Sequence, residues 1–352
     1  MLRLIMMLRL MRNEELKQPD QFFIPHQAKR YSSFFIQNMK KRNWWGRAAW
    51  VLAAGLVLFS FVLFNQAYRF THFSEAAEAG PAGRPSALLL AKYGLLGLPN
   101  PRPADGPAPA VPYEEVQLAA ADGTRLAAWY VPVAEPRGTV ALFHGYHSQR
   151  AGLHTEAAIF RKLGFNTLQL DFRGSGASQG NYTSVGYDEA QDVKATYDYL
   201  RQQDRNRRLY LYGTSMGAVS VLRALRQYAD VQPEGLLLEC PFGTLLNASE
   251  GRLRSLQLPE EPLSHLIVFS GSLINGFWGF SHDAVGYAKA VRVPTLLQWG
   301  EQDPRVSRRE TEAIFAALRG PKQLVTYPGA GHESYARQDS VRWTQAVAAF
   351  LR

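Results

Sequence analysis

From Tyr113 to the end of the chain, short apolar segments alternate with longer segments of helical periodicity. This alternation is typical of a mostly parallel β-sheet wrapped by helices, because parallel strands need long crossover connections. The predicted strands are Glu115–Ala119, Leu126–Tyr130, Thr139–Phe143, Asn166–Leu170, Leu209–Tyr212, Gly235–Glu239, Thr295–Gln298 and Gln323–Thr326. The predicted helices are Ala151–Leu163, Tyr187–Gln203, Met216–Tyr228, Arg308–Leu318 and Ser340–Leu351. We therefore expect one α/β domain over residues 113–352.

More than forty residues between the sixth and seventh predicted strands, about Phe242–Tyr287, fit no single element, and we predict a lid there. Large apolar side chains are frequent in this segment: Leu263, Leu266, Ile267, Val268, Phe269, Leu273, Ile274, Phe277, Trp278 and Phe280. An apolar wall of this kind suits an acyl chain or another hydrophobic group. The same side chains would equally serve to pack the lid on the body, and both interpretations stay open.

The net charge of +9 belongs to the N-terminal arm. Residues 1–47 hold ten Lys and Arg against three Asp and Glu, whereas the remainder holds 29 basic and 27 acidic side chains. A body with nearly balanced charge lacks the basic surface that binds nucleic acid. We therefore expect no nucleic-acid partner.

An uncharged apolar stretch, Ala48–Phe64, follows this arm. Its 17 residues would span about 25 Å as a helix, slightly less than a hydrocarbon core of about 30 Å. Aromatic residues that favour the membrane interface flank it on both sides: Trp44, Trp45, Tyr68 and Phe70. We predict a transmembrane signal anchor over residues 48–70, and a buried core helix is the alternative.

The charges around this stretch predict its orientation. Basic residues cluster before it, whereas only Arg69 follows closely. The preceding basic residues are Lys40, Lys41, Arg42 and Arg47. This bias predicts a cytoplasmic arm over residues 1–47 and an extracytoplasmic body, in the periplasm or at the cell surface. In one alternative the stretch is a signal peptide cleaved near Ser74–Ala79, which gives a secreted protein. In another, Met39 is the true start and the arm is shorter.

Residues 71–112 are rich in Ala, Gly and Pro, a composition that resists both helix and sheet. We predict a linker here. A short apolar patch within it, Ala87–Leu98, predicts a helix that packs on the body.

A serine at the junction of a predicted strand and a predicted helix is the strongest candidate for chemistry. Ser215 lies in Gly213-Thr-Ser215-Met-Gly217, between the strand Leu209–Tyr212 and the helix that begins at Met216. So tight a turn needs glycines on both sides of the serine, because a Cβ atom there would meet neighbouring backbone. The turn presents the hydroxyl at the carboxyl end of the sheet, beside a helix N-terminus that stabilises negative charge. We predict that Ser215 is a nucleophile.

A second match to the same pattern is Gly176-Ala-Ser178-Gln-Gly180. It lies in a Gly-rich loop, with no strand immediately before it and no helix immediately after it. That context cannot hold a nucleophile in strand–turn–helix geometry, so we interpret Ser178 as a loop residue. The loop also lacks the glycine and lysine spacing of a phosphate-binding loop.

A nucleophilic serine needs a base, and the base needs an orienting acid. His332 is the one histidine beyond the seventh predicted strand, and it lies in a Gly-rich loop after the last strand. Asp303 follows the seventh strand, where its carboxylate can accept the Nδ1–H of His332. We predict Asp303 as the acid, with Glu301 and Glu239 as rivals.

The anion formed during attack needs two backbone N–H donors. Met216, directly after the nucleophile, supplies one. The loop after the third strand supplies the other, which we assign to Tyr146, with His144 and Gly145 as supporting residues.

A metal site is not expected. His144 and His147 form an H-x-x-H pattern, but no acidic third ligand lies at a metal spacing. Cys240 is the single cysteine, which excludes an intramolecular disulfide and a cysteine-based zinc cluster.

Five motifs in this order resemble the α/β-hydrolase superfamily over roughly Tyr113 to Arg352. They are Phe143-His-Gly-Tyr, Asp171-Phe-Arg-Gly-Ser-Gly, Gly213-Thr-Ser-Met-Gly, Gly300-Glu-Gln-Asp and Gly331-His332. The likeness is strongest to the monoacylglycerol-lipase and serine-aminopeptidase-like group, which includes membrane-anchored lipid and thioester hydrolases. It implies an eight-stranded sheet, a short helical lid after strand six and no cofactor. The chain carries His-Gly-Tyr where some lipases have His-Gly-Gly-Gly, which speaks against esters of bulky alcohols.

Together, the motifs and the resemblance predict a membrane-anchored serine hydrolase with a Ser215–His332–Asp303 triad. The expected substrate is a small-molecule or lipid ester or thioester with a hydrophobic acyl group, cleaved through an acyl-enzyme. An aminopeptidase-type amide hydrolase and a catalytically inactive hydrolase-fold binding protein are the alternatives.

Overall fold

The computed structural model describes residues 26–74, 86–97, 99–203, 208–255 and 257–352. Two compact units divide the chain, Met1–Phe59 and Ser60–Arg352. More than half of the predicted basic arm, and part of the predicted linker, lie outside the described residues. Each unit is described by itself below.

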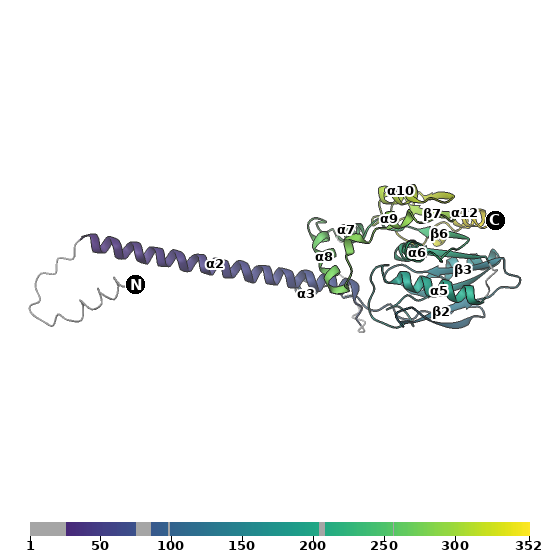
Figure 1. Ribbon diagram of the computed structural model, residues 1–352, viewed down its shortest axis with the longest axis horizontal. Coiled ribbons are helices and arrows are strands. Elements are labelled where there is room, and N and C mark those ends of the chain that lie inside the picture. The colour runs from purple at the N-terminus through teal and green to yellow at the C-terminus, as the bar shows by residue number, and fades with distance from the viewer. Residues whose placement is uncertain (1–25, 75–85, 98, 204–207, 256) are drawn as a thin grey trace, which may run out of the picture. The chain divides into compact units, whose positions relative to one another are not determined.

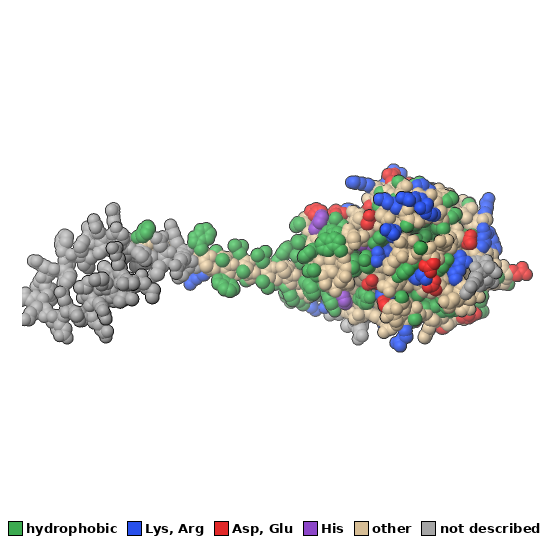
Figure 2. All heavy atoms as spheres, in the orientation of Figure 1, with side chains coloured by type: hydrophobic (Ala, Val, Ile, Leu, Met, Phe, Trp, Pro, Cys, Tyr) green, Lys and Arg blue, Asp and Glu red, His purple; other side chains and the backbone are tan. Residues whose placement is uncertain are grey.

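Helix α2 (His26–Thr71) supplies the described part of the first unit and the beginning of the second. Its segment Trp44–Thr71 is long and apolar enough to cross a membrane, and only 6% of its most apolar window is buried. That exposure contradicts the alternative of a buried core helix. Hydrophobic side chains stand exposed along it (Figure 2): Trp44, Trp45, Trp50, Val51, Leu52, Leu56, Val57, Leu58 and Phe59. The helix is a candidate membrane span by length and composition.

The second unit is built on one eight-stranded sheet with the order β1-β2-β4-β3-β5-β6-β7-β8 (Figure 1). The first two strands pair antiparallel with each other and with β4, and all other pairs are parallel. The strands are β1 (Glu114–Ala119), β2 (Arg125–Val131), β3 (Gly138–Phe143), β4 (Phe165–Leu170), β5 (Leu209–Thr214), β6 (Gly235–Glu239), β7 (Thr295–Gly300) and β8 (Lys322–Tyr327). All eight predicted strands are confirmed, each to within two residues at either end.

Helices cover both faces of this sheet, because alternate strand residues point to opposite sides. Ala141 and Phe143 of β3 join the core under one group of helices, whereas Val140 and Leu142 join the core under the other. The first group is α5 (Glu189–Gln203), α6 (Met216–Gln227), α9 (Ala284–Ala288) and α10 (Arg308–Ala317). The second is α4 (His154–Lys162), which follows a short 3₁₀ turn η1 (Arg150–Leu153), together with α11 (Tyr335–Gln338) and α12 (Ser340–Phe350).

The segment predicted as a lid forms several short elements between β6 and β7. They are α7 (Leu245–Ser255), α8 (Leu263–Asn275), η2 (Gly279–Ser281) and α9. Helices α7 and α8 lie together at one end of the second unit (Figure 1). Hydrophobic side chains gather over α8 on the surface (Figure 2), and Phe269, Leu273 and Trp278 are exposed there. The lid residues therefore do not all pack on the body.

The last turns of α2, within the second unit, pack against this end of the body. Leu63 and Ala67 are buried, and the Gln66 side chain donates hydrogen bonds of 2.9 Å to two carbonyls near the end of α3. Helix α3 (Ala87–Leu96) is the helix predicted within the linker. Beyond it, Arg102 donates hydrogen bonds to carbonyls of the Gly-rich loop after β4, at 3.2 Å to Gly174 and 3.0 Å to Gly176.

Candidate active site

The turn between β5 and α6 holds Ser215 in a strained backbone conformation, with φ of 51° and ψ of −116°. Few residues other than glycine adopt a positive φ, and such strain is common at functional sites. The flanking glycines make the turn possible. A Cβ atom at Gly213 would lie 2.6 Å from the carbonyl carbon of Gly217, and one at Gly217 would lie 2.3 Å from the carbonyl oxygen of Phe143. The steric need for both glycines therefore matches the sequence-based expectation.

Ser215, His332 and Asp303 form one hydrogen-bonded chain. The Nε2 atom of His332 lies 3.0 Å from the hydroxyl of Ser215, and its Nδ1 atom lies 2.7 Å from Oδ2 of Asp303. The other carboxylate oxygen of Asp303 accepts backbone N–H bonds from Arg305 at 2.8 Å and Val306 at 2.9 Å. The Asp303 side chain is fully buried and that of His332 is 13% exposed. The turn after β7 thus fixes the carboxylate, and the carboxylate fixes the imidazole.

The rival acids have other partners. The Glu301 carboxylate accepts a hydrogen bond of 2.7 Å from the Thr326 hydroxyl. The Glu239 carboxylate is buried and accepts a bond of 2.5 Å from the indole N–H of Trp343. Burial raises the pKa of Glu239 to about 8, so this carboxyl group is mostly neutral near pH 7. Neither glutamate is hydrogen-bonded to His332.

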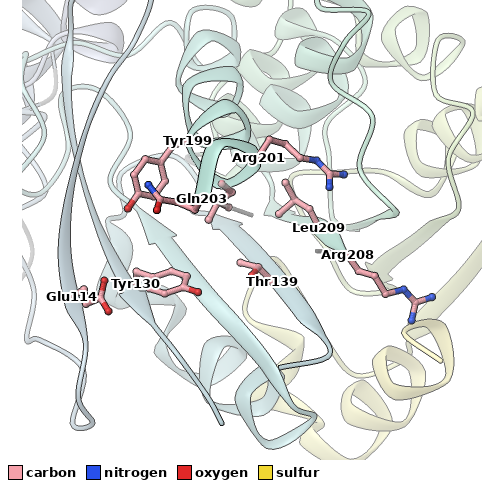
Figure 3. Close-up of a pocket in the computed structure, with 9 residues that line it drawn as sticks. Glu114, Tyr130, Thr139, Tyr199, Arg201, Gln203, Arg208 and Leu209 are labelled. Carbon is pink, nitrogen blue, oxygen red and sulfur yellow. The ribbon is translucent and has the colours of Figure 1, made fainter. Parts of the chain in front are cut away.

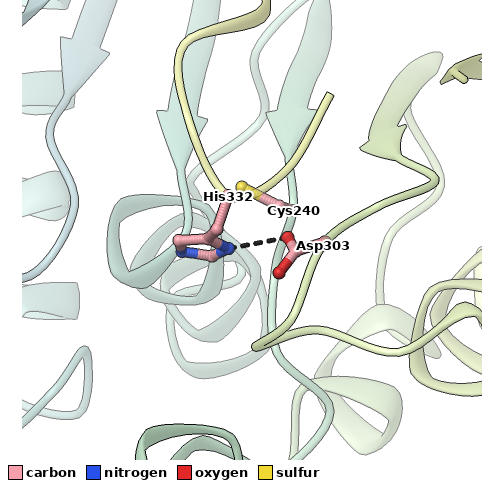
Figure 4. Close-up of side chains that lie close together, drawn as sticks. All are labelled: Cys240, Asp303 and His332. Atoms are coloured by element: carbon pink, nitrogen blue, oxygen red, sulfur yellow. Dashed lines mark hydrogen bonds and ion pairs between the residues drawn. The ribbon is translucent and has the colours of Figure 1, made fainter. Parts of the chain in front are cut away.

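Cys240 lies beside this chain, although the sequence analysis gave it no role. Cys240 directly follows β6. Its sulfur lies within 4.8 Å of a ring nitrogen of His332 and a carboxylate oxygen of Asp303 (Figure 4). Burial would lower the pKa of His332, but Cys240 and Asp303 outweigh this effect and raise the pKa to about 10. The sequence indicated only that Cys240 lies at the carboxyl end of a strand. Its position beside His332 depends on the pairing of β6 with β7 and on the loops that follow them.

Cys240, Asp303 and His332 are also the one group of potential metal ligands that lie this close together among the described residues. In this group the Nδ1 atom of His332 already binds the Asp303 carboxylate, as Figure 4 shows, and its Nε2 atom faces Ser215. We therefore interpret His332 and Asp303 as parts of a hydrogen-bonded relay to Ser215 rather than as metal ligands.

His144 is a buried residue whose ring supports the loop after β3. Its Nε2 atom accepts a hydrogen bond of 3.1 Å from the N–H of Phe172, which leaves Nδ1–H to donate to the carbonyl of Gly145 at 2.8 Å. Burial lowers the pKa of His144 to about 4, so the ring is neutral near pH 7. Both of its nitrogens are engaged, which leaves none for a metal shared with His147.

The two predicted oxyanion donors, Tyr146 and Met216, both line the cavity that opens on Ser215. Met216 is the first residue of α6, so its N–H has no acceptor within the helix. Tyr146 lines the same cavity as Ser215, and its hydroxyl donates to the carbonyl of Phe70 at 2.8 Å. A Cβ atom at Gly145 would lie 3.5 Å from the Cβ of Ser215, an ordinary contact, so the space there does not require glycine.

Ser178, the second serine in a Gly-x-Ser-x-Gly pattern, is a buried structural residue. Its hydroxyl donates to the carbonyl of Asp171 at 2.6 Å and accepts from the N–H of Ala127 at 2.9 Å. The rest of this motif is structural as well. Arg173 forms a buried ion pair of 2.6 Å with Asp192 of α5.

A cavity of about 230 Å³ opens on Ser215 and His332. Its other lining residues are Phe70, Tyr146, Val185, Met216, Phe242, Ala248, Arg252, Arg305 and Val306. We call it the lid-side cavity, because Phe242, Ala248 and Arg252 come from the lid segment. The sequence analysis assigned Phe70 to the membrane interface, but in the structure it lines this cavity and stacks on Tyr146, because its position depends on how the end of α2 packs on the body.

Another cavity of about 220 Å³ lies at the opposite edge of the sheet, where β3 and β5 begin (Figure 3). Thr139 and Leu209 line it, and the side chains of Arg201 and Arg208 lie on the side away from Glu114. Ligands of open α/β sheets bind at the carboxyl ends of the strands, which is the edge that carries Ser215. We therefore place the candidate active site in the lid-side cavity.

Two family models match the chain. Residues 134–258 match the family described as serine aminopeptidase, S33, and residues 278–352 match the prolyl oligopeptidase family. Among curated proteins, YfhR of Salmonella typhimurium is 28% identical over 70% of this chain and 84% of its own length. The α/β hydrolase domain-containing protein WAV2 of Arabidopsis thaliana is 27% identical over 66% of this chain and 76% of its own length.

Solved structures of esterases have the same fold. The Pyrococcus furiosus esterase Pf2001 superposes with a TM-score of 0.57 at 24% identity, covering 72% of this chain and 98% of its own. The esterase EaEST of Exiguobacterium antarcticum gives a TM-score of 0.52 at 17% identity, covering 68% and 99%. The strand order and these neighbours show that the chain has the α/β-hydrolase fold, and the two family matches support its place in the α/β-hydrolase superfamily.

Proposed function

We propose that the protein is a serine hydrolase that cleaves carboxylic esters or thioesters through an acyl-enzyme. The observation that carries this proposal is the hydrogen-bonded chain from the Ser215 hydroxyl through His332 to the buried Asp303 carboxylate. A serine hydroxyl is a weak nucleophile by itself and becomes effective when an oriented base accepts its proton. The strained turn at the carboxyl end of β5 presents that hydroxyl to the lid-side cavity.

In the proposed mechanism, Oγ of Ser215 attacks the substrate carbonyl while Nε2 of His332 accepts the hydroxyl proton. Asp303 accepts the Nδ1–H bond throughout and stabilises the imidazolium that forms. The N–H groups of Tyr146 and Met216 donate to the oxyanion of the tetrahedral intermediate. His332 then gives its proton to the leaving alcohol or thiol. Water, activated by the same imidazole, releases the acid from Ser215.

Amide cleavage is the second candidate, because both matched families are described as peptidases. The esterase neighbours favour esters. The two candidates use the same residues and differ only in the leaving group, so a comparison of substrates separates them.

We also propose that α2 anchors the enzyme in a membrane, with residues 1–47 in the cytoplasm and the hydrolase domain outside it. The exposed apolar surface of Trp44–Thr71 and the basic residues that precede it support this proposal. Exposed apolar side chains on α8 are a further feature that suits a lipid surface. The acyl part of the substrate is correspondingly expected to be hydrophobic.

The test uses full-length protein in a non-ionic detergent and a panel of matched substrates: 4-nitrophenyl esters, acyl thioesters and aminoacyl anilides. We expect turnover of esters or thioesters that is lost in Ser215→Ala. Faster turnover of the anilides would favour the peptidase candidate. A correctly folded wild-type protein that cleaves no member of the panel would favour the inactive binding protein instead.

A further inference from the structure

Two cavities meet at Ser215 and His332, and they differ in charge. The second cavity, of about 190 Å³, is lined by residues of α4 and α11, and we call it the α4-side cavity. Its charged lining residues have both signs: Glu156, Glu333, Arg305 and Arg337. In the lid-side cavity, Arg252 and Arg305 are the charged lining residues besides His332, and none of the described lining residues is Asp or Glu. The lid-side cavity is therefore apolar and positively charged at once.

Arg252 is held in place by two aromatic rings. Its guanidinium lies 5.0 Å from the centre of the Phe70 ring and 5.6 Å from that of Tyr146. The two rings stack on each other at 5.1 Å, and the Tyr146 hydroxyl donates to the carbonyl of Phe70 at 2.8 Å. Aromatic faces hold a guanidinium group in a fixed orientation through cation–π contacts. Arg252 thus carries a positioned charge in the wall that faces Ser215.

Arg305, from the turn after β7, brings a second positive charge to the lining of the lid-side cavity. Its backbone N–H donates to Asp303, so the same turn that fixes the acid fixes the origin of the Arg305 side chain. Arg305 is exposed, and the ion pairs of the described residues include none for it. Arg254, two residues after Arg252 on α7, pairs with Glu260 at 2.8 Å and does not line the cavity.

We propose that the lid-side cavity selects esters that carry an anionic group, a carboxylate or a phosphate, bound by Arg252 and Arg305. The proposal rests on the proposed serine hydrolase function. A hydrophobic segment of the substrate lies against the apolar lining, and its anionic group meets the two guanidinium groups. The cavity volume of about 230 Å³ lies below the usual range of roughly 300–1,000 Å³ for ligand pockets, which favours a short segment between the ester and the anion.

The test compares two pairs of esters on full-length protein in non-ionic detergent. Mono-4-nitrophenyl succinate and 4-nitrophenyl butyrate differ by a charge on the acyl side. 4-Acetoxybenzenesulfonate and 4-nitrophenyl acetate differ by a charge on the alcohol side. The readout is the ratio of kcat/KM for the anionic ester to that for the neutral ester, so the neutral ester is an internal reference. We expect an anionic preference in at least one pair, which identifies the half of the substrate that the cavity binds.

The variants are Arg252→Gln and Arg305→Gln, with Arg254→Gln as the matched control. We expect the ratio to fall by about ten- to a hundredfold in the first two, the range for a hydrogen bond to a charged group, and to hold in Arg254→Gln. Should Arg252→Gln fail to fold, two measurements still test the proposal. The variant Arg305→Gln changes an exposed residue, and added salt should lower the wild-type ratio because it screens the attraction.

Hydrolysis of the neutral esters with no preference in either pair would overturn the inference and leave the proposed function standing. An anionic preference that survives in both Arg252→Gln and Arg305→Gln would overturn it as well. Absence of hydrolysis of all four esters, and of the acyl thioesters of the substrate panel, would remove the proposed function and the inference with it.

Discussion

At the scale of single residues, the hydrogen bonds around His332 allow one tautomer of its neutral ring. Oδ1 of Asp303 accepts two backbone N–H bonds and Oδ2 faces Nδ1 of His332, so Nδ1 carries the proton. Nε2 is then free to accept the proton of the Ser215 hydroxyl 3.0 Å away. The carboxylate therefore selects the tautomer that the mechanism requires.

The first prediction follows from this arrangement. Asp303→Asn should lower kcat by about 10⁴-fold, because an amide in place of the carboxylate favours the wrong tautomer. Glu239→Gln should keep most activity, because the buried Glu239 is mostly neutral and glutamine has nearly its shape. Glu301→Gln should also cost little. Steady-state kinetics on the best ester, with circular dichroism to confirm folding, measures all three. Near-normal turnover in Asp303→Asn with loss in Glu239→Gln would mean that the acid is Glu239.

The second prediction concerns pH. His332 must be neutral to accept the Ser215 proton. The neighbouring Cys240 and Asp303 raise its pKa to about 10. Activity should therefore decline on acidification from a pH well above the ordinary histidine value of about 6.5. Cys240→Ala removes one of the two side chains that raise this pKa and should shift the acid limb of kcat/KM to lower pH. The measurement is the pH profile of kcat/KM for both proteins. An unchanged limb, or one at higher pH, would contradict the role given to Cys240.

At the scale of elements, the third prediction concerns the contact between β3 and α6. A Cβ atom at Gly217 would lie 2.3 Å from the carbonyl oxygen of Phe143, so strand and helix would have to separate. Gly217→Ala should destabilise the fold by about 1–3 kcal/mol, as overpacking does. Gly145→Ala is the control, because its Cβ would make only ordinary contacts of 3.5 Å. Thermal unfolding of the two variants compares them. Equal melting temperatures would show that the turn can relax.

Most strands were predictable from the sequence because they are short apolar runs between turn residues. The buried runs β3, β4 and β7 are examples, whereas β1 alternates exposed and buried residues. The lid was recognised only as a segment without a clear pattern, because α8 exposes apolar residues such as Phe269 and Leu273. Chain order and loop position were enough to nominate Ser215, Asp303 and His332. Cys240 was missed and Phe70 was assigned to the membrane interface, because their place beside the site depends on contacts between distant segments.

At the scale of the whole molecule, the fourth prediction tests the orientation of α2. A reporter that is active only outside the cytoplasm should be active when fused after Arg352 and inactive when fused after Arg42. The physical reason is the cluster of basic residues before the apolar stretch. Activity of the reporter only in the second fusion would show that the orientation of α2 is opposite to the one proposed. Membrane fractionation distinguishes an uncleaved anchor, which keeps the body in the membrane pellet, from a cleaved signal, which releases it.

The central claim is that Ser215 is the nucleophile. A fluorophosphonate probe reacts with an activated serine, and peptide mass mapping identifies the residue that carries the adduct. We predict that wild type and Ser178→Ala carry the adduct on Ser215 and that Ser215→Ala is not labelled. The reason is that only Ser215 has a histidine base, with Nε2 of His332 3.0 Å from its hydroxyl, whereas the Ser178 hydroxyl donates to a backbone carbonyl. Equal labelling of wild type and Ser215→Ala would contradict the account.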